Sequence, residues 1–163
     1  MVGGLSNRFL NRYLKPKCNL FIGVFPVDKC PNPNRLRRPF SLIVNLSEAA
    51  LPGSHFVAMY VDERNNLWYF DSFAFSPPVY NTHLIIFLAE WIRQSKIIHV
   101  TKRPVQSYDS LFCGWFVASF CLFVEKYPPS NFDSFFDYRN LSSNENNVQH
   151  LVKVLCDKIY ELK

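Results

Sequence analysis

A cysteine at the start of a long uncharged stretch is the first place in this chain where reactive chemistry is expected. Cys113 and Gly114 follow the polar segment SYDSLF and precede apolar residues that continue to Val124. A helix N-terminus stabilises a thiolate, because backbone N–H groups there lack partners and the helix dipole is positive. Gly114 leaves space for a substrate backbone. These features predict a nucleophile, although a small buried cysteine at the top of a core helix explains the same residues.

A cysteine nucleophile needs a base and a group that orients the base. His55 opens the segment HFVAMYV, and Asp71 closes the segment LWYFD. The turn residues at 62–66 predict a hairpin, so the start of the first strand lies beside the end of the second. We therefore expect His55 and Asp71 to hydrogen-bond on one face of the sheet.

A glutamine upstream of the cysteine is a candidate for stabilising an oxyanion. Six residues separate Gln106 from Cys113, and its side-chain amide could act beside the backbone N–H of Cys113. The chain order histidine, aspartate, glutamine, cysteine differs from that of papain-like enzymes, in which the cysteine comes first.

The other histidines and cysteines have structural explanations. Cys121 and Cys156 fall on apolar helix faces, so we assign them to packing. The remaining histidines fit an amphipathic helix, an apolar strand and the closing helix: His83, His99 and His150. Their spacing matches no ligand pattern, so the sequence predicts no metal site and no cofactor for the chemistry.

The elements that position these residues follow from hydrophobic periodicity and turn residues. Strands are predicted at NLFIGVF, PFSLIVNL, HFVAMYV, NLWYF and IIHVT. Helices are predicted after a Ser6 cap, from residue 81 or 82, from about Asp109, and at the end of the chain. Strands in the middle with helices around them predict an α+β fold: a mixed or antiparallel central sheet packed against helices, with Cys113 at the N-terminus of a buried central helix.

Length and composition predict one domain over residues 1–163, with a flexible leader at residues 1–5. The chain has 163 residues, of which 48% are hydrophobic, so it can bury a core. The uncharged stretch from Leu111 to Val124 is shorter than the roughly twenty residues of a membrane span, so no membrane partner is expected. Five cysteines, and a start that lacks a secretory signal, predict a protein that is not secreted and that resides in a reducing compartment. We also expect a monomer.

Basic clusters give the chain a formal net charge of +5. They predict one face that could neutralise the phosphates of DNA, although scattered solubilising charge fits equally well. The residues concerned are Arg35, Arg37, Arg38, Lys102 and Arg103.

Two blocks of sequence resemble the adenovirus maturation protease (adenain) family, in the clan that includes the SUMO-specific proteases. LPGSHFVAMYVDERNNLWYFDSFAFSPP is similar to that family's histidine strand, turn and acid strand with a following Phe-x-Phe-Ser segment. PVQSYDSLFCGWFVASFCLFVEKYPP is similar to its Val-Gln, Cys-Gly and hydrophobic helix. The resemblance covers about residues 18–130 and implies a papain-like, adenain-like cysteine protease fold.

The resemblance implies a role for each candidate residue. Cys113 would attack the scissile carbonyl, and His55 would act as the base and later protonate the leaving amine. Asp71 would orient His55, and Gln106 would donate to the oxyanion. The spacing of Gln106 and Cys113 is similar to that of adenain, whereas SUMO-type enzymes usually have one residue fewer and an aspartate where this chain has Phe112.

The resemblance also implies partners and a place of action. Family members cleave capsid precursors after small residues, commonly at Gly-Gly sites, in the virion and in the host nucleus or cytoplasm. The alternatives are a protease specific for ubiquitin or SUMO-like modifiers, and an inactive nucleic-acid-binding or scaffolding protein. The start of this chain, MVGGL, is itself similar to such a site, so self-trimming after Gly4 is a further hypothesis.

Two residues depart from the family pattern. Phe56 replaces the tryptophan that usually follows the histidine, which leaves the shape of the groove cover open. Ser95 stands where adenain has the cysteine that joins an activating peptide through a disulfide. A noncovalent activating peptide and stimulation by DNA are the cofactors that the resemblance implies.

Overall fold

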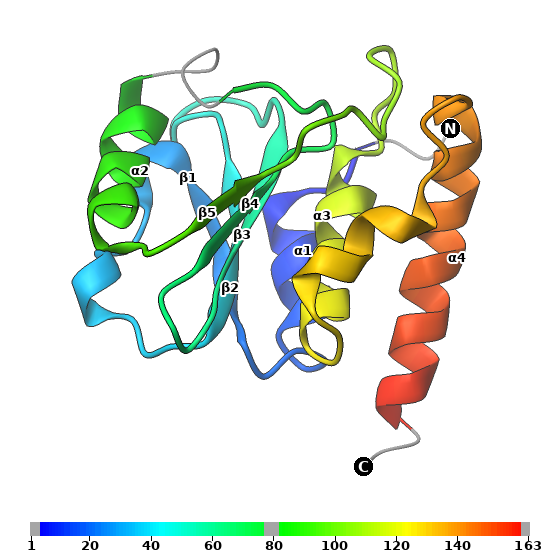
Figure 1. Ribbon diagram of the computed structural model, residues 1–163. Helices are drawn as coiled ribbons and strands as arrows, with labels where there is room; N and C mark the ends of the chain where they lie inside the picture. Colours follow the sequence, from blue (N-terminus) through cyan, green and yellow to red (C-terminus); the bar gives the residue numbers. More distant parts are fainter. Residues whose placement is uncertain (1–3, 77–81, 161–163) are drawn as a thin grey trace.

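A mixed five-stranded sheet forms the centre of the molecule, and the computed structural model describes residues 4–76 and 82–160 (Figure 1). The strand order follows the chain, from β1 to β5. β2, β3 and β4 pair antiparallel, whereas β1 is parallel to β2 and β5 is parallel to β4. The strands are β1 Phe21–Pro26, β2 Phe40–Asn45, β3 Phe56–Val61, β4 Leu67–Phe70 and β5 Ile98–Val100. The predicted hairpin is confirmed as β3 and β4, and the mixed sheet is one of the two predicted arrangements.

Helices cover both faces of this sheet. α2 lies on one face, and α1, α3 and α4 lie on the other (Figure 1). The helices are α1 Asn7–Leu14, α2 Thr82–Gln94, α3 Cys113–Val124 and α4 Leu141–Tyr160; short 3-10 segments are η1 Val27–Lys29, η2 Pro33–Arg35 and η4 Pro129–Phe135. Residue 81, the other predicted start of α2, lies outside the described residues.

The strands look continuously apolar in the sequence because both of their faces are covered. In β2, Leu42 and Val44 pack in the cluster that contains Trp91 of α2, whereas Ile43 packs with Val117 of α3. Successive side chains of a strand point to opposite faces, so both sets are buried only when helices lie on both sides. This three-layer packing holds the central strands, and hence the ends of β3 and β4, in place.

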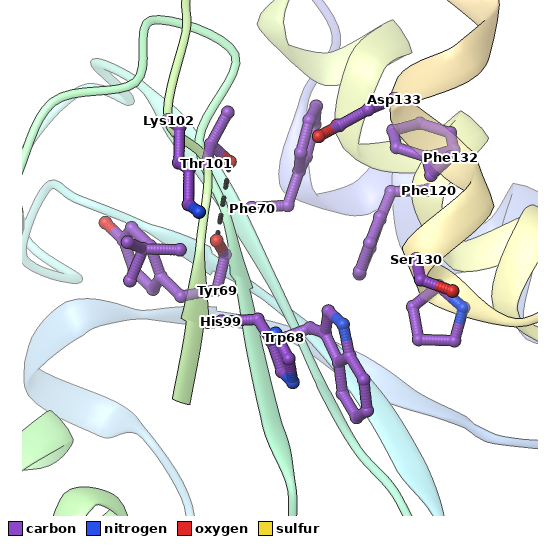
Figure 2. A pocket seen from close by; sticks show the side chains of 12 residues that line it. Trp68, Tyr69, Phe70, His99, Thr101, Lys102, Phe120, Ser130, Phe132 and Asp133 are labelled. Atoms are coloured by element: carbon purple, nitrogen blue, oxygen red, sulfur yellow. Dashed lines mark hydrogen bonds between the residues drawn. The ribbon is translucent and has the colours of Figure 1, made fainter. Parts of the chain in front are cut away.

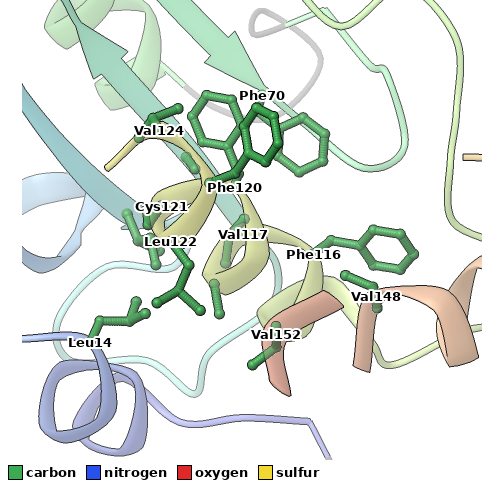
Figure 3. Packing of buried hydrophobic residues seen from close by; sticks show 14 of the residues in the cluster. Leu14, Phe70, Phe116, Val117, Phe120, Cys121, Leu122, Val124, Val148 and Val152 are labelled. Atoms are coloured by element: carbon green, nitrogen blue, oxygen red, sulfur yellow. The ribbon is translucent and has the colours of Figure 1, made fainter. Parts of the chain in front are cut away.

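α3 lies in the middle of the helical layer (Figure 3). Phe120 of α3 stacks on Phe70 of β4 with ring centroids 5.2 Å apart. Val148 and Val152 of α4 pack against α3 on another side, beside Phe116 (Figure 3). Burying each such side chain contributes roughly 1.5–3 kcal/mol. The helix is therefore a rigid support for the residue at its N-terminus.

The start of α3 differs from the prediction. The sequence predicted a helix from about Asp109, but α3 begins at Cys113 and its N-cap, Phe112, makes no side-chain cap hydrogen bond. Residues 107–112 form a loop in which the Ser110 N–H donates to Ser107 O and the Ser110 hydroxyl accepts from Phe112 N–H. Because these local bonds replace helical ones, Cys113 is the first residue of the helix.

The N-terminal helix begins as predicted. The Ser6 hydroxyl accepts a hydrogen bond from Phe9 N–H at 3.1 Å, which caps α1. Asn45 Nδ2, at the end of β2, donates to Asn7 Oδ1 at 2.8 Å. Of the predicted leader, residues 1–3 lie outside the described part of the chain, and Leu5 is half-buried against the helical layer.

In the part of the chain that the structure describes, no helix combines the length and the apolar character that crossing a bilayer requires.

Candidate active site

The hairpin places His55 and Asp71 at the same end of β3 and β4. Ala58 lies opposite Phe70 in this ladder, so continuing the register puts His55 opposite Phe73. His55 and Asp71 are then diagonal neighbours on one face, within reach of each other's side chains. His55 Nε2 lies 2.8 Å from Asp71 Oδ1, and the two side chains are 9% and 1% exposed. The contact expected from the sequence is therefore present.

The Asp71 carboxylate is held by its surroundings. Its Oδ1 atom also accepts a hydrogen bond from Phe73 N–H at 2.9 Å. The Asp71 backbone N–H donates to Thr101 Oγ1, just beyond β5, at 3.0 Å. Because two neighbouring segments fix Asp71, its carboxylate is oriented toward the imidazole before any substrate binds.

The side chain of Cys113 interacts electrostatically with the imidazole of His55 and raises its pKa. Burial lowers the pKa of His55, but the hydrogen bond to Asp71, the interaction with Cys113 and the negative charges of both groups raise it, to about 9 overall. The imidazole thus holds its proton at neutral pH beside the sulfur.

Unpartnered backbone donors lie next to the sulfur. No described residue accepts a hydrogen bond from the backbone N–H of Cys113 or Gly114. Both N–H groups are in the first turn of α3, where the helix dipole favours negative charge. These N–H groups would stabilise a thiolate at the sulfur. They would also stabilise the oxyanion of a substrate whose carbonyl carbon is bonded to the sulfur.

An aromatic wall, which we define as Phe73, Phe75 and Tyr108, lies on one side of His55. The ring of Phe73 stacks on the imidazole, with centroids 4.6 Å apart and planes 21° apart. Tyr108 contacts Phe73 at 5.6 Å and stacks on Phe75 at 5.5 Å. The stacking role of Phe73 was not predicted from the sequence, in which the Phe-x-Phe segment after the acid strand was the signal for it.

Gln106 is fully buried at the start of the loop that leads to Cys113. Its Oε1 accepts a hydrogen bond from the Ser72 hydroxyl at 2.6 Å. Its Nε2 donates to Ser110 O at 2.9 Å and lies 3.3 Å from Ser110 Oγ. The structure therefore places Gln106 near the nucleophile but gives its amide protein partners, among them Ser72, which the sequence analysis did not single out.

A cavity of about 660 Å³ opens beside these residues. Cys113 and His55 line it together with Phe56, two members of the aromatic wall and the N-terminal segment at residues 4–8. Leu5 of that segment lies directly on Gly114: a Cβ built on the glycine would come within 2.8 Å of Leu5 Cβ. Among the described residues that line the cavity, Arg8 is the only basic one besides His55, and none is Asp or Glu.

A second cavity, of about 250 Å³, lies between β4, β5 and the segment around η4 (Figure 2). Trp68 and His99 stack on each other at its edge, with ring centroids 4.5 Å apart. Lys102 and Asp133 also line it. None of the four residues predicted to be catalytic belongs to this cavity.

The structure does not bring the predicted basic residues together. Arg35, Arg37 and Arg38 precede β2, whereas Lys102 and Arg103 follow β5. Pairing makes β2 and β5 run in the same direction, so the two clusters lie at opposite ends of the sheet. Arg38 hydrogen-bonds to a glutamine of α2, and Arg103 lies 3.9 Å from the centre of the Tyr138 ring.

All five cysteines are free, and the described residues contain no group of three or more His, Cys, Asp or Glu that could hold a metal ion. Cys121 and Cys156 are buried, and Tyr13 hydroxyl lies 2.9 Å from Cys156 Sγ. Burial raises the pKa of the Cys121 thiol well above its ordinary value, and Cys113 is the cysteine that contacts a histidine. Cys121 and Cys156 are therefore packing residues, as the sequence predicted.

Several solved structures match the chain, among them the two described below. No family model and no curated protein matches the chain. The ASFV pS273R protease is 18% identical with a TM-score of 0.47 over 72% of this chain, which corresponds to 44% of that protease, less than half its length. The central domain of the uncharacterized Lpg1148 protein from Legionella pneumophila is 14% identical with a TM-score of 0.53, and the match covers 96% of this chain and 99% of that domain. The second match shows that nearly the whole chain has a fold seen in a solved structure.

Proposed function

We propose that the chain is a cysteine endopeptidase in which Cys113 is the nucleophile. The observation that carries this proposal is that His55, hydrogen-bonded to Asp71, lines one cavity together with Cys113, whose side chain raises the pKa of the imidazole. A packing role, such as that of Cys121, does not explain why a histidine and a cavity lie beside Cys113. The resemblance of the two sequence blocks to the adenain family supports the same chemistry.

The proposed reaction begins with attack of the Cys113 sulfur, as its thiolate, on the carbonyl carbon of the scissile peptide bond. The carbonyl oxygen becomes an oxyanion, which the backbone N–H of Cys113 and the amide of Gln106 stabilise. The protonated His55 gives its proton to the leaving amine as the C–N bond breaks, and a thioester to Cys113 remains. His55 then accepts a proton from water, which attacks the thioester and releases the acid, while Asp71 holds the ring in position.

The substrate that we propose is a polypeptide with small residues, of the Gly-Gly type, at the cleavage site. Bulky side chains surround Cys113 in the cavity, including Phe56, Phe73 and Leu111, and they favour a substrate backbone without large side chains at the reacting position. Capsid or virion precursor proteins of a virus or a virus-like element are the substrates that the resemblance suggests. A modifier-specific protease that acts on Gly-Gly termini uses the same chemistry and is the alternative.

Activation and location belong to the same proposal. A serine at position 95 cannot form the disulfide that joins adenain to its activating peptide, so any such peptide would bind this chain noncovalently. Stimulation by DNA would act through one of the two separate basic clusters rather than through a single basic face. We propose a monomer that acts in the virion and in the host nucleus or cytoplasm.

Cleavage of a peptide library tests the proposal, with Cys113→Ala as the control and with duplex DNA present or absent. Turnover by the wild type and none by the variant is the expected result. Release of a fluorophore from a ubiquitin-like fusion, but not from short Gly-Gly peptides, would replace the endopeptidase proposal by the modifier-specific one. Slow alkylation of Cys113 near pH 6 that does not depend on His55 would instead indicate an inactive protein that has kept the fold.

A further inference from the structure

A tight turn at residues 71–74 holds side chains that contact both His55 and Gln106. Ala74 N–H donates to Asp71 O at 2.9 Å and closes the turn. Ala74 has a φ of 56°, a left-handed conformation that residues with a side chain seldom adopt. Such strain persists where the surroundings hold the backbone, and it is common at functional sites. The two residues inside this turn, Ser72 and Phe73, face Gln106 and His55 respectively.

Ser72 and Gln106 are joined twice, and both are fully buried. Gln106 N–H donates to Ser72 O at 3.1 Å, and the Ser72 hydroxyl donates to Gln106 Oε1 at 2.6 Å. The contact that Gln106 Nε2 makes shows that the Ser72 hydroxyl is the donor in the second bond. Ser110 O can only accept, so the amide nitrogen of Gln106 must face Ser110 and its oxygen must face Ser72.

The network continues from Gln106 to the nucleophile. Ser110, which accepts from Gln106 Nε2, also accepts from Phe112 N–H at 3.2 Å through its hydroxyl. Phe112 is the N-cap of α3 and directly precedes Cys113. An unbroken series of hydrogen bonds therefore runs from the acid turn, through Ser72, Gln106 and Ser110, to the residue before the sulfur.

We propose that Ser72 is a positioning residue of the reaction. Its hydroxyl fixes the amide of Gln106 so that the N–H groups point toward Ser110, in the loop that leads to Cys113. This inference rests on the proposed function, and it adds a residue that does not line the cavity and does not contact His55. Without the hydroxyl, Gln106 Oε1 is a buried acceptor without its partner, and the amide can rotate.

The test compares Ser72→Ala and Ser72→Cys with the wild type and with Gln106→Ala, on a fluorogenic Gly-Gly peptide. We expect Ser72→Ala to lower kcat by about ten-fold with little change in KM, because one neutral hydrogen bond to a buried acceptor is lost. Ser72→Cys keeps the volume and a weak donor, and should lose less. In a Gln106→Ala background Ser72→Ala should change kcat by less than about two-fold, because its target is already gone.

Two further measurements separate positioning from general damage. A peptide aldehyde forms a tetrahedral adduct with an oxygen in the oxyanion position, so Ser72→Ala and Gln106→Ala should both weaken its binding. Alkylation of Cys113 by iodoacetamide creates no oxyanion and should proceed at the wild-type rate in both variants. Ser119→Ala is the matched control: Ser119 is equally buried, and its hydroxyl bonds to Phe116 O within α3.

The outcomes distinguish this inference from the proposed function. If the wild type cleaves the peptide and Cys113→Ala does not, the protease proposal stands. Wild-type kcat in Ser72→Ala, or losses from Ser72→Ala and Gln106→Ala that multiply in the double variant, would then overturn the positioning role alone. A wild type without any Cys113-dependent cleavage would overturn both.

Discussion

Replacing Asp71 by asparagine removes one negative charge next to His55 and keeps the shape of the side chain. In the native chain the Asp71 carboxylate accepts from His55 Nε2 at 2.8 Å and from Phe73 N–H at 2.9 Å. An asparagine oxygen can still accept both bonds. The change therefore tests the charge of Asp71 more than its packing.

The size of the effect follows from the pKa of His55. That pKa is raised from 6.5 to about 9, a difference of 2.5 units, although burial acts in the opposite direction. At about 1.4 kcal/mol per unit, the net preference for the imidazolium is roughly 3 kcal/mol. Asp71 and Cys113 supply this preference together, so losing the charge of one should lower the pKa by about one unit or more. The protonated fraction of His55 at pH 9 then falls about five-fold, from roughly one half to roughly one tenth.

The pH dependence of kcat/KM measures this change. The imidazolium is present below the pKa of His55 and disappears as the pH rises through it, so wild-type activity should decline near pH 9. In Asp71→Asn the decline should begin at lower pH. NMR titration of the His55 ring nitrogens gives the same pKa without any substrate.

The control is Asp109→Asn, since Asp109 is an exposed carboxylate in the loop before Cys113. This variant also removes one negative charge, but it should leave the pH dependence of kcat/KM unchanged. If kcat/KM of Asp71→Asn also declines near pH 9, and the pKa of His55 in this variant is unchanged, then Asp71 does not stabilise the imidazolium and our account of the pair is wrong.

Three further changes test other parts of the site. Cys113→Ala should abolish peptide cleavage while leaving the melting temperature close to that of the wild type; residual turnover would assign the nucleophile elsewhere. Gln106→Ala should lower kcat by roughly a hundred-fold, the usual effect of losing an oxyanion donor, and unchanged turnover would refute the assignment. Gly114→Ala places a methyl group 2.8 Å from Leu5 Cβ, and overpacking of this kind typically costs about 1–3 kcal/mol in urea unfolding. Adding Leu5→Ala should recover part of that loss, and a double variant no more stable than Gly114→Ala would argue against the contact.

The pairing of His55 with Asp71 could be predicted because it depends on local pattern. Two apolar segments on either side of the turn at 62–66 specify the hairpin, and the register of a hairpin brings its two open ends together. Asp62 fills its expected turn role, as its carboxylate accepts from the N–H groups of Arg64 and Asn66. Nothing beyond the hairpin is needed to place this pair.

The start of α3 and the role of Ser72 could not be predicted in the same way. Asp109 has the residue type of a helix cap, but hydrogen bonds from Gln106 and Phe112 to Ser110 keep the loop out of the helix. Ser72 and Gln106 are 34 residues apart in the chain, and their contact depends on how the acid turn packs against that loop. Such long-range bonds leave no periodic signal in the sequence.

The seating of Leu5 on Gly114 has a practical consequence for how the protein is produced. Any polypeptide fused ahead of Gly4 would emerge at the mouth of the cavity that holds the sulfur. An amino-terminal purification tag would thus join the described part of the chain beside this cavity, where it can obstruct the entry of peptides.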